Sequence, residues 1–370
     1  MNIEQDIFGR VSFGHPNLEL NCLFYGDNLD ILRLHIPDDS VDLVYLDPPF
    51  NSNASYNVLF AERNGSQAAA QIKAFEDTWH WDQIAAQAYQ EVVEGGGKPS
   101  QAMQAFRTFL GDSNMLAYLA MMAPRLVELH RVIKPTGSIY LHCDPTASHY
   151  LKMLMDAVFG PGNFINEIIW CYSQGGKSGK RFGRKHDSVL WYSRSRDYTF
   201  NGDAVRVEMK SGKESFGGRL ETDADGRKYR LVYGTKNARG ETRYYKYYLD
   251  EGKVPEDYWT DINSLQSSVA ERLGYPTQKP EALLERIILA SSNEGDVVLD
   301  PFCGCGTTIA VAERLKRRWI GIDSSLEAIT LTKKRLIKVG KDMGGFSSVP
   351  DFIVEDRSSE DRPRSREDAP

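Results

Sequence analysis

The sequence contains no long apolar segment. Of its 370 residues 41% are hydrophobic, yet no run approaches the roughly 18 consecutive apolar residues that a membrane-spanning helix needs. The first twenty residues also lack the basic start followed by an apolar stretch that marks a secretory signal. We therefore expect a cytoplasmic protein that makes no contact with a membrane.

Cysteines are few and scattered. The five of them, Cys22, Cys143, Cys171, Cys303 and Cys305, form an odd set, which excludes a disulfide scaffold and is typical of reduced thiols. Cys303 and Cys305 are separated by one residue, but no histidine or second cysteine pair lies at a spacing that zinc would need. The sequence therefore predicts no metal site.

An excess of basic residues is also missing. With 45 lysines and arginines against 51 acidic residues, the formal net charge is −6, so composition alone does not indicate nucleic-acid binding. Phosphate is met by a local patch rather than by the average charge, and such a patch has to be sought along the chain. The length fits about two domains, or one large α/β domain that carries an insert.

Two stretches of the chain alternate between strand and helix patterns. The predicted strands are 20–25, 41–46, 138–142, 297–299 and 319–322, and the predicted helices are 28–34, 115–132, 146–159, 281–290, 307–316 and a last one from 326. This alternation predicts an α/β fold whose framework consists of residues 1–170 and 271–345.

Three other segments interrupt this framework. Residues 62–110 are rich in alanine and glutamine, with a break at 95–97, and predict a mainly helical insert. Residues 171–270 are polar and glycine-rich with clustered Arg, Lys and Tyr, and predict a separate inserted module. The tail, 356–370, mixes both charges with Pro and Ser and lacks apolar residues, which predicts disorder.

A glycine-rich loop at 300–308 (DPFCGCGTT) lies between a predicted strand and a predicted helix. Gly304 and Gly306 let the backbone turn tightly and approach a ligand, and the next helix presents its free N–H groups there. Asp323 ends the following strand, where a carboxylate can accept hydrogen bonds from ribose hydroxyls. The loop lacks a full G-x-G-x-x-G and the Gly-Lys-Ser/Thr of a P-loop. We therefore predict a nucleoside-containing cofactor, and a dinucleotide oxidoreductase is disfavoured.

A second motif, Asp47-Pro48-Pro49-Phe50, follows the strand predicted at 41–46. The prolines end the strand and leave carbonyl acceptors beside the Asp47 carboxylate, with Phe50 as a flat apolar face. A planar ligand with an exocyclic NH2 would stack on Phe50 and donate its hydrogens to Asp47 and a carbonyl. Its nitrogen lone pair could then attack a methyl donor held in line, through positioning and electrostatics. Taken alone, the segment could also be a simple strand-to-turn junction.

Basic residues are interleaved with glycines between 177 and 196. Those predicted to follow a phosphate backbone are Lys177, Lys180, Arg181, Arg184 and Lys185. Aromatic residues gather farther along, within 200–265, where we expect contacts with base edges. The alternative for these segments is a solvated basic face with aromatic residues in the core.

Six segments together resemble the amino-directed S-adenosylmethionine-dependent DNA methyltransferases in their β arrangement. They are FYGDN (24–28), LDPPF (46–50), KPTGSIYLHCD (134–144), YPTQKPEALLERI (275–287), VLDPFCGCGTT (298–308) and WIGID (319–323). The target-amine segment precedes the variable region and the cofactor loop comes last, which is a circularly permuted order. The resemblance implies a Rossmann-like class I methyltransferase with a mixed, mostly parallel seven-stranded sheet and a target-recognition module at 171–270.

The resemblance also implies roles for individual residues. The target base would be held by Asp47, Pro48, Pro49 and Phe50. The residues implied to bind the cofactor, S-adenosyl-L-methionine, are Asp27, Thr277, Gln278, Lys279, Asp300, Phe302, Gly304, Gly306, Thr307 and Asp323. Among these, Asp27 would meet the adenine edge, Asp323 the ribose hydroxyls, and residues 277–279 the methionine carboxylate.

The implied reaction is site-specific methyl transfer to an amine of a base flipped out of double-stranded DNA. In the family, Asp at the first position of the tetrapeptide usually goes with adenine N6 and Ser with cytosine N4, so Asp47 favours adenine. Methylation at cytosine C5 is disfavoured because no cysteine follows a proline. Cytosine N4 methylation and a catalytically silent DNA-binding relative stay open. A second copy of the chain, a cognate restriction endonuclease and a location on the nucleoid are further expectations.

Overall fold

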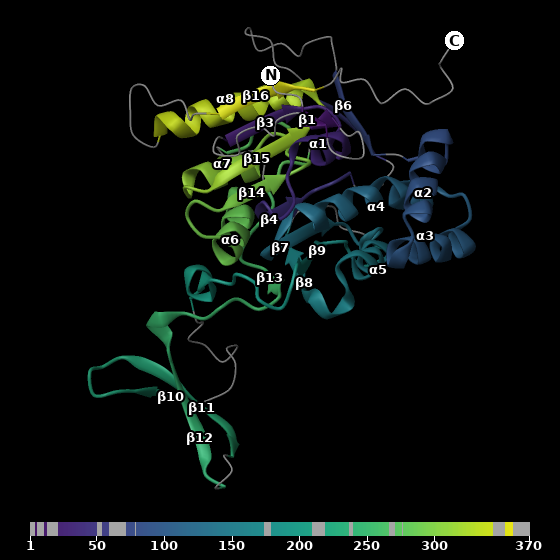
Figure 1. Ribbon diagram of the computed structural model, residues 1–370. Coiled ribbons are helices and arrows are strands. Elements are labelled where there is room, and N and C mark those ends of the chain that lie inside the picture. Colours follow the sequence, from purple (N-terminus) through teal and green to yellow (C-terminus); the bar gives the residue numbers. More distant parts are fainter. Residues whose placement is uncertain are drawn as a thin grey trace, which may run out of the picture.

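The computed structural model describes residues 4–5, 11–12, 21–49, 54–58, 72–77, 79–173, 179–208, 219–236, 240–265, 271–275, 277–342 and 352–357. The strands of its main sheet are β3 (Asn21–Tyr25), β4 (Val41–Leu46), β7 (Ile133–Cys143), β8 (Phe164–Cys171), β9 (His186–Ser193), β13 (Tyr258–Trp259), β14 (Val297–Asp300), β15 (Arg318–Asp323) and β16 (Phe352–Asp356). They are arranged in the order β13-β8-β9-β7-β4-β14-β15-β3-β16 (Figure 1). All neighbours are parallel except β9, which runs antiparallel to β7 and β8.

The predicted α/β fold with a mixed, mostly parallel sheet is confirmed, but the sheet is wider than the seven strands expected. The described sheet has nine strands. The two additional strands lie at its edges, where β13 pairs with β8 and β16 pairs with β3. β13 has only two residues, too few to form a pattern, and β16 lies next to the charged C-terminal tail, where the sequence predicts no strand.

Helices cover both faces of the sheet (Figure 1). On one face lie α1 (Asn28–His35), α4 (Asn114–Val132) and α5 (Ser148–Phe159), and on the other lie α6 (Glu281–Ser291), α7 (Thr307–Arg314) and α8 (Leu326–Asp342). Because both faces are covered, the central strands read as continuous apolar runs, which is why the sequence identifies them well. Local chemistry sets the helix starts as well: the Asp27 carboxylate accepts the Leu29 N–H at the start of α1.

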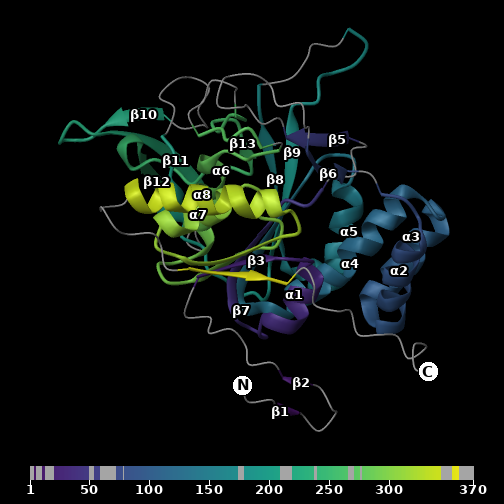
Figure 2. The ribbon, with the colours of Figure 1, turned by 90° about the horizontal axis from the view of Figure 1, so that it is seen from above.

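The predicted helical insert at 62–110 is helical only in its second part. α2 (Gln83–Gly95) and α3 (Gly97–Leu110) pack beside α4 and α5 (Figure 2). β5 (Ala54–Val58) and β6 (Ile72–Asp77) instead pair as an antiparallel two-stranded sheet, so the prediction is wrong for 72–77. Residues 62–71 lie outside the described residues. Strand pairing depends on a partner segment elsewhere in the chain, which composition within the insert does not reveal.

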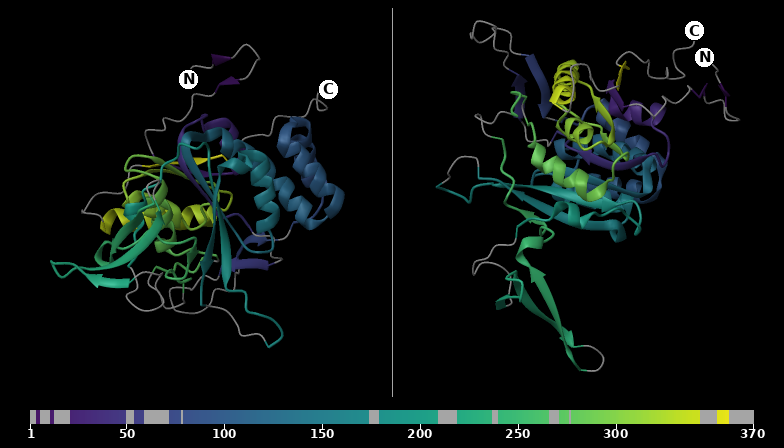
Figure 3. Two further views of the ribbon diagram at one scale, coloured as in Figure 1. Left: turned by 90° about the horizontal axis from the view of Figure 1, so that it is seen from below. Right: turned by 90° about the vertical axis from the view of Figure 1, so that its left-hand side faces the viewer.

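The predicted module at 171–270 does not begin at residue 171. β9, inside that range, belongs to the main sheet, where Trp191 pairs with Tyr140. The separate part is an antiparallel sheet of β10 (Arg219–Thr222), β11 (Lys228–Lys236) and β12 (Thr242–Tyr248), which we call the paddle. The paddle projects away from the body of the protein (Figure 3). The chain leaves the body and returns at one place, because Val207 and Lys253 exchange two backbone hydrogen bonds of 2.8 and 2.9 Å.

The remaining elements are short. They are the strands β1 (Glu4–Gln5) and β2 (Val11–Ser12) and the 3-10 helices η1 (Pro161–Asn163), η2 (Gly202–Val205) and η3 (Leu249–Glu251). The first residue of the predicted disordered tail, Asp356, still belongs to β16, where it pairs with Tyr25. Residues 358–370 of that tail lie outside the described residues. Over the described ranges, none of the helices combines the length and apolar character needed to cross a membrane.

Candidate active site

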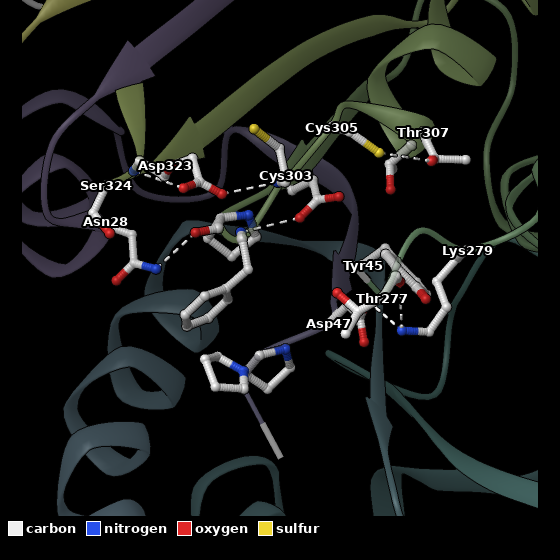
Figure 4. A pocket seen from close by; sticks show the side chains of 18 of the residues that line it. Asn28, Tyr45, Asp47, Thr277, Lys279, Cys303, Cys305, Thr307, Asp323 and Ser324 are labelled. Carbon is white, nitrogen blue, oxygen red and sulfur yellow. Dashed lines mark hydrogen bonds and ion pairs between the residues drawn. The ribbon is translucent and has the colours of Figure 1, made fainter. Parts of the chain in front are cut away.

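The carboxyl ends of four adjacent parallel strands meet at one edge of the main sheet. Asp47 follows β4, Asp300 ends β14, Asp323 ends β15, and Asp27 follows β3 after one glycine. Loops after the carboxyl ends of parallel strands gather in one crevice, which is where ligands bind in open α/β sheets. All four residues line one cavity of about 320 Å³. Figure 4 shows two of them, Asp47 and Asp323, in this cavity. This volume lies within the range of small-molecule and cofactor sites.

The glycine-rich loop after β14 is built around two residues in the left-handed backbone region. Gly304 has φ 52° and Gly306 has φ 75°. A Cβ atom at Gly306 would lie 2.6 Å from Cγ2 of Thr332 on α8, so this glycine is needed for packing. Gly304 lines the cavity and its N–H donates to Oδ2 of Asp323 at 2.9 Å, whereas Gly306 is not among the lining residues. The sequence predicted both glycines, and the structure gives them different surroundings.

Two carboxylates, the buried Asp300 and the half-buried Asp323, give the cavity its electrostatic character. Asp323 accepts hydrogen bonds from the N–H groups of Gly304 and Ser325, and Asp300 accepts one from Phe302. Burial raises the pKa of Asp300 to about 7 and that of Asp323 to about 6. A positively charged or hydroxyl-bearing ligand beside them would stabilise their ionised forms.

Asp27 is held by residues that the sequence did not identify as part of the site. Arg125 of α4 donates to both Asp27 carboxylate oxygens at 2.9 and 3.1 Å, and to Oδ1 of Asn28 at 2.6 Å. Asn28 in turn donates to the carbonyl of Pro301 at 2.6 Å. This network fastens the start of α1 to the glycine-rich loop. Since Arg125 lies 97 residues from Asn28, no local pattern could have paired them.

Asp47 has one engaged and one open carboxylate oxygen. Its Oδ2 accepts a hydrogen bond of 2.5 Å from Nζ of Lys279, which also donates to the Thr277 carbonyl at 3.3 Å. Its Oδ1 is buried and has no hydrogen-bond partner among the described residues. Such an oxygen is costly to bury unless a ligand N–H meets it. Thr277 has φ 62°, a strained conformation for a β-branched residue of a kind that clusters at functional sites.

The other predicted residues of the target-amine segment lie at the same cavity. Pro48 and Pro49 line it, and Phe50 lies outside the described residues. An aromatic wall is nevertheless present, because Trp79, from the insert, lines the cavity as well. Trp79 is not among the predicted site residues, since nothing in its own segment connects it with the motif at 47–50.

Two of the residues predicted to bind the cofactor line the cavity, but their side chains form hydrogen bonds to other parts of the protein. The Gln278 amide donates to the Glu271 carbonyl and accepts from the Leu273 N–H, both at 2.8 Å. The Thr307 hydroxyl accepts a 2.9 Å hydrogen bond from Arg335 of α8. These two side chains therefore shape the cavity wall, to which the predicted residue Phe302 also belongs.

The predicted basic loop lies near the same edge of the sheet. It connects β8 to β9, and β8 runs in the same direction as β7 and β4, so the loop emerges where the carboxyl ends of those strands lie. Lys180, Arg181 and Arg184 are exposed, and Lys185 is half-buried with its Nζ 3.2 Å from the Ser173 carbonyl. Lys177 lies outside the described residues.

The paddle presents aromatic and basic side chains on an open surface. Tyr233, Tyr244, Tyr245 and Tyr247 are 44–61% exposed. Tyr233 pairs directly with Tyr244 across β11 and β12, and residues opposite each other in a sheet share a face. Exposed aromatic rings beside cations suit stacking on bases and contact with phosphate.

Comparisons with known proteins agree with this geometry. A family model described as DNA methylase matches residues 41–334. The chain is 29% identical over 320 residues to the DNA adenine methyltransferase YhdJ of Escherichia coli (strain K12), covering 86% of this chain and 83% of that protein. It is 34% identical over 237 residues to the type II methyltransferase M.HpaI of Haemophilus parainfluenzae, covering 64% of each.

A solved structure supports the fold. The PvuII DNA methyltransferase, described as cytosine-N4-specific, matches with a TM-score of 0.51 at 16% sequence identity, over 89% of each chain. At this level of identity the likeness concerns the arrangement of the elements and not the substrate.

Proposed function

The chain belongs to the N6/N4 DNA methylase family, and from this premise we propose that it methylates the N6 amine of an adenine in double-stranded DNA. The methyl donor is S-adenosyl-L-methionine. The observation that carries the proposal is Asp47, whose open carboxylate oxygen belongs to the cavity that Asp300 and Asp323 share.

The cavity residues fit S-adenosyl-L-methionine. When bound, the cofactor supplies a methyl group activated by a positively charged sulfur. The carboxylates of Asp300 and Asp323 suit its positive charge and ribose hydroxyls, and Lys279 suits its carboxylate. Asp27, held by Arg125, would meet the adenine edge. Gly304 keeps the wall free of a Cβ atom that would lie 3.3 Å from the Tyr275 ring.

The target amine would be held at the end of β4. Asp47 Oδ1 would accept one amine hydrogen, and a carbonyl of Pro48 or Pro49, which line the same cavity, would accept the other. Adenine is favoured because Asp leads the tetrapeptide and because the relative YhdJ is named an adenine methyltransferase. The cytosine-N4-specific structure shares the fold alone and so does not favour cytosine.

DNA would be held outside the cavity by the basic loop and the paddle. A base within a duplex cannot reach Asp47 and must be flipped out, at a cost of a few kcal/mol. Exposed Lys180, Arg181 and Arg184 support phosphate binding near the cavity, and the exposed tyrosines support base contact by the paddle. A second copy of the chain and a cognate restriction endonuclease stay predictions.

The proposal is tested by expressing the protein in a bacterium that lacks DNA methylation and mapping modified bases by single-molecule sequencing. We expect N6-methyladenine within one recurring sequence. N4-methylcytosine in its place would contradict the choice of base.

The matched control is Asp47→Ala, which removes the acceptor of the target amine and leaves the glycine-rich loop intact. Methylation should fall below detection, while cofactor binding measured by calorimetry stays within about threefold of the wild type, because Asp47 acts on the amine. A variant that still methylates DNA at a near-native rate would refute the role of Asp47.

A further inference from the structure

A chain of hydrogen bonds leads from the cavity into the sheet, and the role proposed for Asp47 does not use it. Oη of Tyr45 lies 2.9 Å from Nδ1 of His142, and Nε2 of His142 lies 3.1 Å from Oδ2 of Asp187. Tyr172 donates to the other oxygen of the same carboxylate at 3.1 Å. Three neighbouring strands, β4, β7 and β9, thus place a hydroxyl, an imidazole and a carboxylate in a row.

The first member of this chain lies beside the target-amine acceptor. Tyr45 precedes Asp47 by two residues, so the two side chains project to the same side of the extended backbone. Both line the cavity, and Figure 4 shows Tyr45 next to Asp47 and Lys279. Tyr45 and His142 are almost fully buried, at 1% and 0% exposure, whereas the Asp187 side chain is 13% exposed.

The direction of the hydrogen bonds follows from the charge of Asp187. Burial alone would raise the pKa of this carboxyl, but hydrogen bonds from His142 and Tyr172 and the charge of Lys279 hold it below its ordinary value. An ionised carboxylate only accepts, so Nε2 of His142 carries a hydrogen, and in the neutral imidazole Nδ1 is then the acceptor. Tyr45 therefore donates to Nδ1, and the remaining lone pair of its oxygen is left to accept a hydrogen bond.

Tyr45 keeps its proton until a base takes it. Burial raises its pKa well above the ordinary value, and the nearby carboxylates Asp47, Asp300 and Asp187 act in the same direction. A neutral phenol that donates to an imidazole backed by a carboxylate is the arrangement by which a hydroxyl proton is moved in catalytic triads.

We propose that Tyr45, His142 and Asp187 form a relay that takes the proton released by the target amine. Tyr45 is the catalytic residue that contacts the amine, and His142 and Asp187 are positioning residues that act through it. This inference rests on the proposed methylation of an amine, and it adds a route for the proton that methylation must release.

The step balances in atoms and electrons. The amine nitrogen uses its lone pair to bond the methyl carbon, the bond from that carbon to sulfur breaks, and sulfur keeps the electron pair. The nitrogen, now positively charged, loses one hydrogen as a proton to Oη of Tyr45 and keeps the electrons of that N–H bond. The proton of Tyr45 passes to Nδ1 of His142, and Asp187 stabilises the resulting imidazolium. After the methylated base has left, Nδ1 of His142 returns its proton to Tyr45, and Oη of Tyr45 releases one proton to water in the cavity.

Asp47 is better suited to holding the amine than to removing its proton. Its Oδ2 already forms an ion pair with Lys279, and its Oδ1 is the oxygen open to the amine. A separate proton acceptor leaves this carboxylate charged while positive charge develops on the nitrogen. The titratable groups around the relay include Tyr172 after β8, Asp144 after β7, Lys279 in the cavity, and Asp300 at the end of β14.

Single-turnover methyl transfer from tritiated cofactor to unmethylated bacterial DNA tests the relay. Tyr45→Phe removes only the hydroxyl, and the rate should fall by about 100-fold, the lower end of what a general base contributes. Its affinities for cofactor and DNA should stay within about threefold of the wild type. Tyr172→Phe is the matched control, because it removes a hydrogen bond to the same Asp187 carboxylate outside the relay, and its rate should change by less than about threefold.

A second variant keeps the test decisive if Tyr45→Phe does not fold. Asp187→Asn keeps the shape but lets an amide N–H face Nε2 of His142, which reverses the imidazole tautomer and leaves Tyr45 without an acceptor. The rate should again fall by about 100-fold. The affinities for cofactor and DNA should stay within about threefold of the wild type, so that the loss falls on the transfer step and not on binding. Tyr172→Phe should change neither the rate nor these affinities by more than about threefold.

Rates of Tyr45→Phe and Asp187→Asn within about threefold of the wild type would overturn the relay. An equal loss in Tyr172→Phe would overturn it too, since that result indicates a structural network. A wild-type protein that transfers no methyl group to DNA would overturn the proposed function itself, so the two failures are distinguishable.

Discussion

Asp300 and Asp323 are unusual among the residues of the site because both are carboxylates withdrawn from solvent at strand ends, Asp300 fully and Asp323 in part. Burial disfavours the charged form, and it raises the pKa of Asp300 to about 7 and that of Asp323 to about 6. An apolar residue at either position would avoid this cost of burying a charge, so we infer that both carboxylates serve to bind a ligand. Each acid thereby makes the site sensitive to pH near neutrality.

Cofactor affinity should therefore rise with pH. Below about pH 6 both carboxyls are largely protonated and lose their attraction for a positively charged ligand, so affinity should be about tenfold or more weaker near pH 5 than near pH 8. Calorimetric titration with S-adenosyl-L-methionine across this range measures it. In Asp300→Asn the change of cofactor affinity with pH should be smaller, since Asp323 is then the one member of this pair that still titrates. A flat wild-type profile would contradict this expectation.

The same burial predicts a stability effect of opposite sign. The folded pKa of Asp300 lies above its unfolded value of about 3.9, so the folded state binds more protons between these values. The stabilisation that this group contributes to the folded state is therefore complete below about pH 4, and it disappears as the pH rises through about 7. Asp300→Asn should raise the melting temperature near pH 8 and change it little near pH 4, as measured by calorimetry without cofactor. A lower melting temperature near pH 8 would show that the ionised carboxylate is stabilising.

Affinity for S-adenosyl-L-methionine should also depend on Asp323. Its two oxygens accept the N–H groups of Gly304 and Ser325, so it shapes the loop as well as lining the cavity. Asp323→Ala should weaken S-adenosyl-L-methionine binding by several-fold or more, because about 1.4 kcal/mol of lost interaction corresponds to a factor of ten. Asp323→Asn, which keeps the shape and one acceptor, should lose less. Calorimetry showing no change in either variant would count against this assignment.

At the scale of elements, the junction of α7 and α8 shows why a glycine is required at 306. Gly306 lies at the start of α7 with φ 75°, and a Cβ there would meet three atoms of the Thr332 side chain at 2.6–3.0 Å. Thr332 in turn donates to the Gly304 carbonyl at 3.0 Å, so it cannot move without disturbing the loop. The close approach of the two helices thereby fixes the shape of the cavity wall.

Gly306→Ala should consequently destabilise the protein by about 2–4 kcal/mol, the sum of overpacking and a strained backbone. Gly295→Ala is the matched control, because Gly295 has φ 85° but a Cβ atom there would meet nothing within 4 Å, so it carries the backbone cost alone. Gly295→Ala should lower the free energy of unfolding by about 1 kcal/mol. Urea unfolding measures both values, and equal losses would refute the packing argument.

At the scale of the whole molecule, an acidic protein is expected to bind a polyanion through two local surfaces. The net charge is −6, yet the described part of the loop between β8 and β9 is basic, and the paddle extends beyond the body (Figure 3). Neither surface is part of the cavity, so catalysis and DNA binding are expected to be separable by mutation. The pairing of Val207 with Lys253 marks the place where the paddle can be removed.

Replacing residues 209–252 with a short Gly-Ser linker should leave the body folded. The two ends are already joined by backbone hydrogen bonds, and a short flexible loop closes them at small entropic cost. Cofactor affinity and melting temperature should match the full chain, whereas site-specific DNA affinity should fall by about tenfold or more because base contacts are worth about 1–3 kcal/mol each. Fluorescence anisotropy with a target duplex measures this, and unchanged DNA affinity would argue against recognition by the paddle.

Charge reversal in the basic loop should act differently. Arg181→Glu with Arg184→Glu should weaken binding to target and non-target DNA alike, and the slope of log affinity against log salt should fall by about 2 if each arginine contacts one phosphate. The melting temperature should not change, because both side chains are exposed. An unchanged affinity across the salt titration would refute phosphate binding by this loop.

The sequence by itself determined the α/β framework and the order of its motifs. Strands buried on both faces leave continuous apolar runs, helices leave a period of about 3.6, and glycines and prolines mark the loops at strand ends, all of which are local signals. These signals located Asp47, Asp300, Gly304 and Asp323, and the order of strands in the sheet then brought the four to one cavity.

Only the tertiary structure decided which side chains meet across that cavity. The Asp47–Lys279 pair joins residues 232 positions apart, and Tyr45 meets His142 across 97 positions. The same holds for β9, which reads as part of a polar module but takes its place between β7 and β8. Strand pairing and buried hydrogen bonds depend on partners that folding brings together, and the sequence of a single segment does not show which segment it will contact.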